Sequence, residues 1–321
     1  MNSTFKSILK DEFSSFMKFI KLSVANENVY LSTLLDFDSF LHSEGLMEKK
    51  IDINQVIRWL DGLSVCLSTK KCRLSRIKRF ADYLSTIGIP VSLPELPRNT
   101  VEFKPYVFSA DEMQQIFEIA DDLILSYPNS RINAEFPILL RILYGCGLRL
   151  GEAVSLSWDD IDLSTGIITV KSAKKQKQRI VPMSDELTRI LELYRKANCF
   201  HLQNCACLFT KNNGQRRSKT CYLVVFKKIL YSLGIKNAQN SKYGSRGPCL
   251  HSLRHTFALH SLLKSETEGR NFIETVPFLS TYLGHSGLME TDKYLNARHE
   301  LYTKAHSVIA DYTRDVFPKE V

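Results

Sequence analysis

Apolar residues recur at helical spacing through the first part of the chain. In the segment 70–86 the apolar positions lie three or four residues apart, on one face of a helix: Leu74, Ile77, Phe80, Ala81 and Leu84. The same spacing predicts helices over residues 7–22, 29–42 and 54–63. We therefore expect a helical bundle in the first hundred or so residues.

Prolines interrupt this helical pattern between residues 90 and 105. Proline disfavours a helix interior, so the segment IPVSLPELPRNTVEFKP, with four prolines, predicts an extended linker. The boundaries that follow are a first domain at 1–97, a linker at 98–107 and a second domain at 108–321. Ser109, followed three residues later by Glu112, is typical of a capping box that starts the first helix of the second domain.

A strand pattern occurs once in the second domain. Two β-prone runs, at 167–170 and 179–183, flank a polar turn rich in lysine, which predicts a pair of antiparallel strands. Elsewhere the apolar spacing stays helical, as in 137–144 and 218–235. The expected fold is mainly α with a small antiparallel β-sheet: a helical N-terminal domain followed by an α+β domain.

The chain is basic, and its charge is unevenly distributed. Lysine and arginine total 43 against 34 aspartate and glutamate, which gives a net charge of +9. The segment 193–265 contains no acidic residue but thirteen lysines and arginines, including Arg216, Arg217, Lys227 and Lys228. Because such a surface attracts phosphate groups, we expect a nucleic-acid partner and salt-sensitive binding.

A second basic cluster accompanies the apolar face of the segment 70–86. It contains no acid between Asp61 and Asp82, and its members are Lys70, Lys71, Arg73, Arg76, Lys78 and Arg79. We expect one face of this helix to pack and the other to contact phosphate groups. Contacts of this kind position a protein on nucleic acid without reading its sequence.

Five residues with phosphate chemistry follow one another in the second domain: Arg149, His251, Arg254, His285 and Tyr294. Each alone has an ordinary explanation. Arg149 follows an apolar helix, where an arginine is commonly a helix cap or part of a surface ion pair. His251, Arg254 and His255 share a helix face that a solvated basic surface would also produce. As an ordered set, they favour a phosphoryl-transfer site with a tyrosine nucleophile.

These residues lie in the boxes GLRLGE at 147–152, HSLRH at 251–255 and LGH at 283–285, with Tyr294 nine residues beyond His285. In these boxes the chain resembles the tyrosine recombinase (phage integrase) family over residues 107–297, in its simple two-domain form. The resemblance implies a DNA-clamping, core-binding first domain and a catalytic second domain. It also implies that Arg149, His251, Arg254, His285 and Tyr294 are catalytic.

The resemblance implies a catalytic lysine in the hairpin as well. Counting back from Pro182, the family pattern places it at Lys174, although Lys171, Lys175 and Lys177 are close enough to compete. A solvated basic turn that touches phosphate nonspecifically is the alternative. If Lys174 is the catalytic lysine, it would protonate the leaving 5′ oxygen as a general acid.

The chemistry explains these residue types. A tyrosine hydroxyl with an ordinary pKa near ~10 is a weak nucleophile, and the phosphodiester it attacks is negatively charged. The guanidinium groups of Arg149 and Arg254 suit two phosphate oxygens at once. Glu152 is either a carboxylate that orients Arg149 or an unrelated surface acid. No metal and no other cofactor is expected, because arginine and lysine do what magnesium does elsewhere.

Three functions remain open at this point. The leading one is a site-specific recombinase that integrates or excises a bacterial mobile element, as a homotetramer on double-stranded DNA sites, with any accessory proteins those sites require. A type IB topoisomerase would use similar chemistry as a monomer, and a DNA-binding accessory factor would have lost it. The chain shows no signal peptide and no run that could span a membrane, so we expect the bacterial cytoplasm, in association with the nucleoid.

Overall fold

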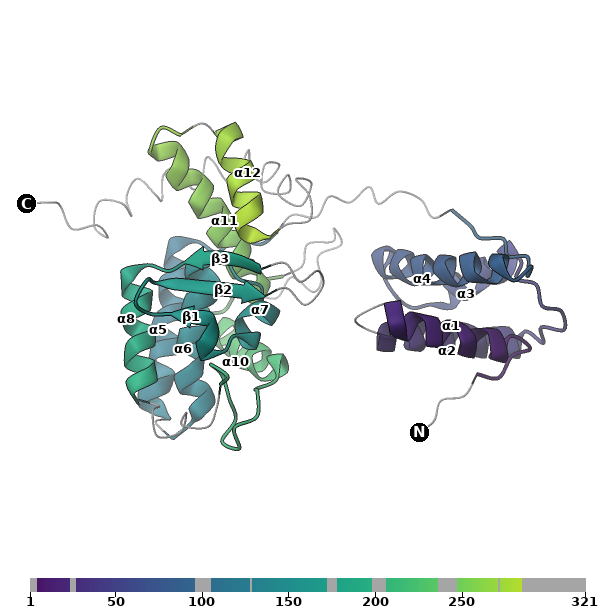
Figure 1. Cartoon of the computed structure of the whole chain (residues 1–321), viewed down its shortest axis with the longest axis horizontal. Helices are drawn as coiled ribbons and strands as arrows, with labels where there is room; N and C mark the ends of the chain where they lie inside the picture. Colours follow the sequence, from purple (N-terminus) through teal and green to yellow (C-terminus); the bar gives the residue numbers. More distant parts are fainter. Residues whose placement is uncertain are drawn as a thin grey trace, which may run out of the picture. The chain divides into compact units, whose positions relative to one another are not determined.

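A computed structural model describes residues 5–23, 27–95, 105–127, 129–171, 178–197, 206–235, 247–270 and 272–284. The chain divides into two compact units, Met1–Thr100 and Val101–Val321 (Figure 1). Each unit has its own hydrophobic core. The described part is mostly helical with one small antiparallel sheet, so the predicted fold class is confirmed.

Helices packed around aromatic side chains form the first unit. They are α1 (Lys10–Ser23), α2 (Glu27–Ser43), α3 (Ile53–Gly62) and α4 (Leu67–Thr86). All four match predicted helices, with small shifts at their ends. Phe13 and Phe80 are fully buried, and their rings stack with centroids 4.3 Å apart. This contact joins α1 to α4, which carries the basic cluster.

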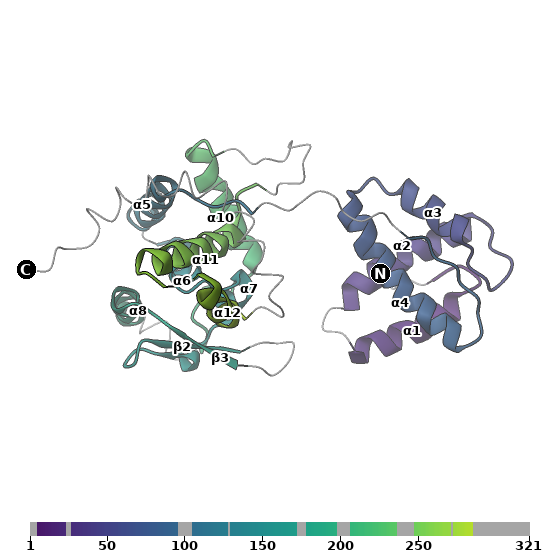
Figure 2. The same cartoon turned by 90° about the horizontal axis from the view of Figure 1, so that it is seen from above.

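In the second unit, α6 lies among the other helices (Figure 2). The helical elements are α5 (Ala110–Ser126), α6 (Arg131–Gly145), α7 (Leu150–Ser155), the 3-10 turn η1 (Trp158–Asp160), α8 (Asp185–Ala197), α10 (Lys219–Ser232), α11 (Leu250–Thr267) and α12 (Phe272–Leu283). The predicted capping box of α5 is confirmed, because Ser109 accepts a hydrogen bond from the backbone of Glu112 and Glu112 accepts one from Ser109.

The sheet has the order β1-β2-β3, and all its pairs are antiparallel. Its strands are β1 (Ile161–Asp162), β2 (Ile167–Lys171) and β3 (Gln178–Pro182). The predicted hairpin of β2 and β3 is confirmed, and Val170 pairs with Arg179. β1 was not expected, because two residues are too few to show the alternation by which a strand is recognised.

Helix α6 begins earlier than its sequence pattern suggested. Pro137 lies inside the helix and not at its start, although proline lacks the N–H that an interior position donates. Glu135 and Phe136, just before it, are fully buried. Tertiary packing of the second turn of α6 therefore overrides the local preference of proline for a helix start.

Glu135 is a fully buried carboxylate that attaches α10 and the preceding loop to α6. Its oxygens accept hydrogen bonds from the backbone N–H of Thr210 at 2.9 Å, the Arg217 Nε at 2.6 Å and the Tyr222 hydroxyl at 2.7 Å. Arg131 approaches the same carboxylate at 3.5 Å. A buried charge is tolerated when it is paired and hydrogen-bonded in this way.

Helices α11 and α12 form a helical hairpin with a small apolar cluster of its own: Ala258, Leu262, Val276, Leu279 and Leu283. The segment 264–271 includes the last turn of α11. Gly269 follows with a positive φ of 75°, and α12 starts at Phe272. Gly269 and Arg270 therefore leave α11 in a turn, in which their backbone N–H groups donate to the carbonyls of Glu266 and Ser265.

We expect Glu135→Ala to lower the free energy of unfolding of the second unit by about 3–5 kcal/mol, because it leaves Arg217 as a largely buried charge without its partner. Urea unfolding followed by the fluorescence of Trp158, in a Trp59→Phe background, measures this unit. Glu118→Ala, on the exposed face of α5, is the control and should change stability by less than about 0.5 kcal/mol. Equal stabilities for the two variants would contradict the prediction.

Candidate active site

A glycine turn between α6 and α7 places the first predicted site residue. Gly147 has a φ of +60°, and a Cβ atom there would meet the Phe257 ring at 2.4 Å. Both the backbone conformation and the close approach therefore require glycine. Leu148 is buried behind the turn, and Arg149 is the N-cap residue of α7 with a half-exposed side chain.

Arg254, on α11, is almost completely buried, with 1% of its surface exposed. Its Nη1 donates to the Gly147 carbonyl at 2.7 Å, and its Nη2 donates to the Leu283 carbonyl at 2.6 Å. The alternative of a solvated basic face is thus wrong for Arg254. His251 is exposed and His255 half-buried on the same helix, with their rings in edge contact 4.6 Å apart.

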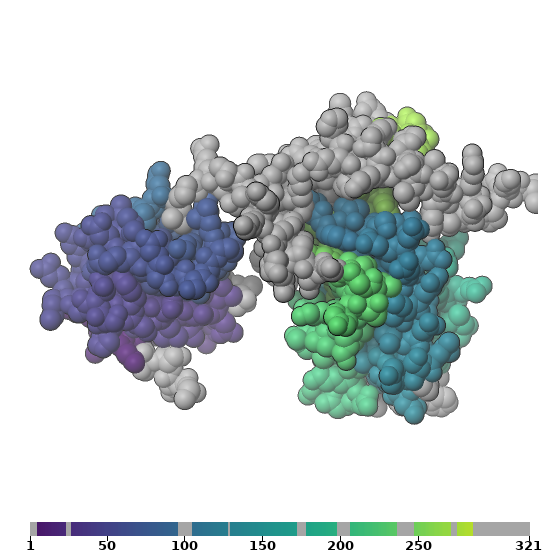
Figure 3. Space-filling model, turned by 180° about the vertical axis from the view of Figure 1, so that it is seen from behind, coloured from purple at the N-terminus to yellow at the C-terminus, as the bar shows by residue number. Residues whose placement is uncertain are grey.

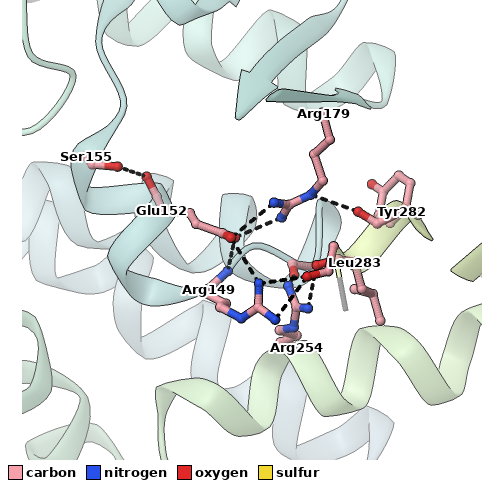
Figure 4. Close-up of polar contacts among 9 residues, drawn as sticks. Arg149, Glu152, Ser155, Arg179, Arg254, Tyr282 and Leu283 are labelled. Carbon is pink, nitrogen blue, oxygen red and sulfur yellow. Dashed lines mark hydrogen bonds and ion pairs between the residues drawn. The ribbon is translucent and has the colours of Figure 1, made fainter. Parts of the chain in front are cut away.

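A third arginine, Arg179 on β3, was not singled out in the sequence. Its Nε donates to the Tyr282 carbonyl at 2.9 Å, and its Nη1 and Nη2 donate to the two carboxylate oxygens of Glu152 at 3.1 and 2.8 Å (Figure 4). The sequence offered one signal for this residue: an arginine within a predicted strand, and an acid in the GLRLGE box with which it could form an ion pair.

Arginines 179, 254 and 149 reach three successive carbonyl groups at the end of α12. Arg179 binds the carbonyl of residue 282 and Arg254 that of residue 283, while Arg149 approaches that of Gly284 at 3.3 Å. The last carbonyls of a helix have no partner within it and carry the negative end of the helix dipole. Gly284 immediately precedes His285, which lies outside the described residues.

Glu152 orients the guanidinium groups of Arg149 and Arg179. The expectation that this carboxylate orients Arg149 is therefore confirmed, and Glu152 is not an unrelated surface acid. It accepts from the backbone N–H of Arg149 at 2.9 Å and from its Nη1 at 3.2 Å, in addition to the two bonds from Arg179. Burial alone would raise the pKa of Glu152, but the bonds from Arg179 and Arg149 outweigh it and lower the pKa to about 2. Glu152 is therefore ionised at neutral pH.

The hairpin lysines divide into one described residue and three that lie outside the described part. Lys171, at the end of β2, pairs with Asp160 at 2.5 Å, and this hydrogen bond raises the pKa of Lys171. A raised pKa makes an ammonium group a weaker acid. Lys174, Lys175 and Lys177 lie outside the described residues, as does Tyr294.

The predicted DNA contacts of the second unit fall into two groups. Arg217 pairs with Glu135 and is 12% exposed, so its charge is already compensated inside the protein. Arg216 donates to the Ser155 carbonyl at the end of α7. Helix α10 lies beside α5 (Figure 3). Its exposed side chains include Lys227 and Lys228 together with the apolar Leu223, Val224 and Tyr231.

The arginines of the first unit turn partly toward α2 and not wholly into solvent. Arg73 pairs with Asp36 at 2.7 Å, and Lys70 lies 3.7 Å from Asp61. Arg76 and Arg79 instead bind neutral hydroxyl groups, those of Thr33, Tyr30 and Ser23. The charges of Arg76 and Arg79 are therefore not cancelled by these contacts. Lys71 is half-buried, and Lys78 is exposed.

Two features are absent from the described residues. No group of three or more histidine, cysteine, aspartate and glutamate side chains there is arranged to hold a metal ion. Within the same part of the chain, no helix combines the length and apolar character that crossing a bilayer requires.

Residues 107–300 match the sequence model of the phage integrase family. Among full-length relatives, a protein of Sinorhizobium fredii that bears the integrase/recombinase name y4rB is 28% identical, over 85% of this chain and 87% of its own length. Tyrosine recombinase XerC of Chlorobaculum tepidum is also 28% identical, over 89% of this chain and 90% of its own.

Solved structures with the same fold include XerH site-specific recombinase bound to a palindromic difH substrate in a post-cleavage complex. It has a TM-score of 0.67 and 20% identity, over 93% of this chain and 84% of that one. A lambda integrase tetramer bound to a Holliday junction has a TM-score of 0.60 and 15% identity, over 87% of this chain and 77% of that one. The chain therefore has the same fold as XerH and lambda integrase.

We expect Gly147→Ala to lower the free energy of unfolding by about 2–5 kcal/mol. A left-handed backbone costs an ordinary residue about 1–2 kcal/mol, and overpacking against Phe257 costs about 1–3 kcal/mol more. Thermal unfolding followed by circular dichroism measures the loss. Gly145→Ala is the control, because a Cβ atom there meets only Leu187 at an ordinary 3.7 Å. A Gly147→Ala protein as stable as this control would refute the steric argument.

Proposed function

The chain belongs to the phage integrase family, and on this premise we propose that it is a site-specific DNA recombinase that joins Tyr294 covalently to DNA. The observation that carries the proposal is the cluster of arginines at the end of α12, one residue before His285 and ten before Tyr294. The tyrosine recombinase relatives support it, since they align along most of their length. The alternative of a silent DNA-binding factor would not need this cluster.

Arg149 and Arg254 offset the charge of the scissile phosphate. Arg254 is held by two backbone carbonyls in a buried position, so its guanidinium does not have to reorganise when charge develops on the phosphate oxygens. A preorganised donor of this kind contributes about 3 kcal/mol to the transition state. Arg149 is held by Glu152 and remains partly exposed, so a phosphate can reach it.

The remaining steps fall to residues outside the described part and to His251. Tyr294 attacks the phosphorus, and the 5′ oxygen leaves with a proton from Lys174. His251 and His285 donate to the nonbridging oxygens or help to take the tyrosine proton. A 5′ hydroxyl group of another strand then attacks the 3′-phosphotyrosyl bond and restores the tyrosine. The step conserves bond energy, so it consumes no nucleoside triphosphate.

DNA is held by both units in this proposal, with residues 1–97 as the core-binding domain and 108–321 as the catalytic domain. In the first unit Arg76 and Arg79 retain the charge that phosphate contacts require, together with Lys71. In the second unit Lys227 and Lys228, which are exposed on α10, are better placed than Arg217. Binding through these groups should weaken as salt concentration rises.

A tetramer on two DNA sites completes the proposed reaction, because strand exchange needs two cleaved duplexes. The lambda integrase tetramer on a Holliday junction supports this assembly for a protein of the same fold. The integrase name of the Sinorhizobium fredii relative favours a mobile element as the source of the sites. The likeness to the Tn1549 transposon integrase, with a TM-score of 0.61 and 15% identity, favours it as well. A type IB topoisomerase would instead relax plasmid that carries no recombination site.

We expect Tyr294→Phe to bind DNA normally but to form no covalent protein–DNA adduct, because the phenylalanine ring has no oxygen to attack phosphorus. The test uses a nicked duplex carrying the DNA that flanks the gene of this protein, with adducts resolved on a denaturing gel. Tyr282 is the nearest described rival, and burial raises the pKa of its hydroxyl, which makes it a poor nucleophile. An adduct that persists in Tyr294→Phe would move the nucleophile elsewhere.

We expect Lys174→Ala to slow cleavage by about 100- to 10,000-fold, the usual contribution of a general acid. In a substrate with sulfur in place of the bridging 5′ oxygen, the leaving group is a thiolate, which needs no proton. This substrate should therefore restore most of the cleavage rate that Lys174→Ala loses. Arg254→Ala is the control, and it should stay slow on both substrates because its role is at the nonbridging oxygens. Rescue of Lys175→Ala or Lys177→Ala instead would reassign the acid along the hairpin.

A further inference from the structure

Arg179 connects three elements that come from distant parts of the chain. It lies on β3, where it pairs with Val170 beside the end of the hairpin. From there its guanidinium binds both carboxylate oxygens of Glu152 on α7, and its Nε binds the carbonyl of Tyr282 on α12 (Figure 4). The side chain is 16% exposed, so these bonds form largely away from solvent.

The turn that ends α12 is shaped around this side chain. Gly284 has a φ of +66°, and a Cβ atom there would lie 3.1 Å from the Arg179 Nη1 and 3.3 Å from its Cζ. The guanidinium thus packs against the backbone of the residue before His285. The carbonyl of the same glycine faces Arg149 at 3.3 Å.

The charges of this cluster give Arg179 a second effect. Glu152 carries one negative charge, and the two arginines that bind it carry two positive charges. With Arg179 present, Glu152 orients Arg149 while the three groups together keep a net positive charge. Without it, Arg149 and Glu152 would form a neutral pair with much less attraction for phosphate.

We propose that Arg179 is a positioning residue for DNA cleavage, which acts through Glu152 on Arg149 and through the carbonyl of Tyr282 on the turn that leads to His285. This inference rests on the proposed function and names a group that touches neither the tyrosine nor the phosphate in that mechanism. Because β3 directly follows residues 172–177, which contain the candidate lysines, Arg179 also ties the position of this strand to the phosphate-binding arginines.

The first test compares Arg179→Gln and Arg179→Lys with the wild type. The probe is a duplex that the wild-type protein selects from a random-sequence pool, and the readouts are its affinity and the single-turnover rate of adduct formation. We expect Arg179→Gln to change affinity little, because the other basic groups still bind the DNA backbone, and to reduce the rate about 10- to 100-fold, the cost of misplacing a reacting group slightly. Arg179→Lys restores the charge but not the bidentate geometry, so it should recover part of the rate.

Arg141→Gln is the matched control, since Arg141 also makes a bidentate ion pair, with Asp121 between α5 and α6. It should cleave at the wild-type rate. An Arg179→Gln rate equal to that of Arg141→Gln would overturn the proposal.

A double-mutant cycle with Glu152→Gln separates positioning from a general loss of structure. If Arg179 acts mainly through Glu152, the double variant should be little slower than Glu152→Gln alone, because the two changes remove the same interaction. If the cleavage rate of the double variant falls by the product of the two single effects, Arg179 does not act through Glu152.

The pH dependence provides a further readout that structural damage alone would not produce. The Arg179 hydrogen bonds lower the pKa of Glu152, so their removal raises that pKa toward or above its ordinary value. As the pH is lowered, the Arg179→Gln variant should therefore lose cleavage activity at a higher pH than the wild type does. If both proteins lose cleavage activity at the same acidic pH, the result overturns the proposal.

A measurement without DNA keeps this inference distinct from the proposed function. A carbon-13 NMR titration of the Glu152 carboxyl group should show a higher pKa in Arg179→Gln than in the wild type, and a value unchanged from about 2 would overturn the link. Absence of any adduct in the wild type, or an adduct in Tyr294→Phe, would refute the proposed function instead. The two failures are therefore told apart.

Discussion

The unpaired carbonyl groups at the end of α12 are the constraint around which the second unit is arranged. Each needs a donor once it is removed from water, and the helix itself has none to offer. Arginines from β3, from the turn before α7 and from α11 supply the donors. Strand, turn and helices are thereby joined at one point. Gly147 and Gly284 there have positive φ angles, and a Cβ atom at either position would crowd a neighbouring side chain.

Among the described residues of the second unit, the clusters of paired charges around Glu135 and Glu152 have opposite consequences. Around Glu135 the partners come from α6, α10 and the loop between residues 206 and 217, and the cluster lies inside the protein. Its charges stabilise the fold and are not available to a ligand. Around Glu152, a single carboxylate serves Arg149 and Arg179 while Arg254 lies beside them, so positive charge remains in excess. That excess is what an anionic substrate requires.

Short sequence boxes identified Arg149 and Arg254 because their spacing is local and distinctive. The same boxes could not show that Arg254 is buried, since its partners are carbonyls at residues 147 and 283, which no side-chain pattern encodes. Arg179 was missed for a related reason: its strand looked like half of a hairpin, and its partners lie 27 and 103 residues away. Arg217 looked like a phosphate contact because charge counts do not reveal a buried acid such as Glu135.

The helical hairpin of α11 and α12 is held at one end by the arginines, and residues 267–270 at its other end are exposed. Arg254 and the carbonyl of Leu283 lock the end beside the arginines, while the turn at Gly269 lies roughly 20 Å farther along α11, at 1.5 Å per residue. Extra turns added to both helices at that distal end would lengthen the hairpin into solvent without displacing the locked carbonyls. Evolution could therefore vary the outer tip of this hairpin, and with it the contacts made by the protein surface, while the chemistry at its base stays the same.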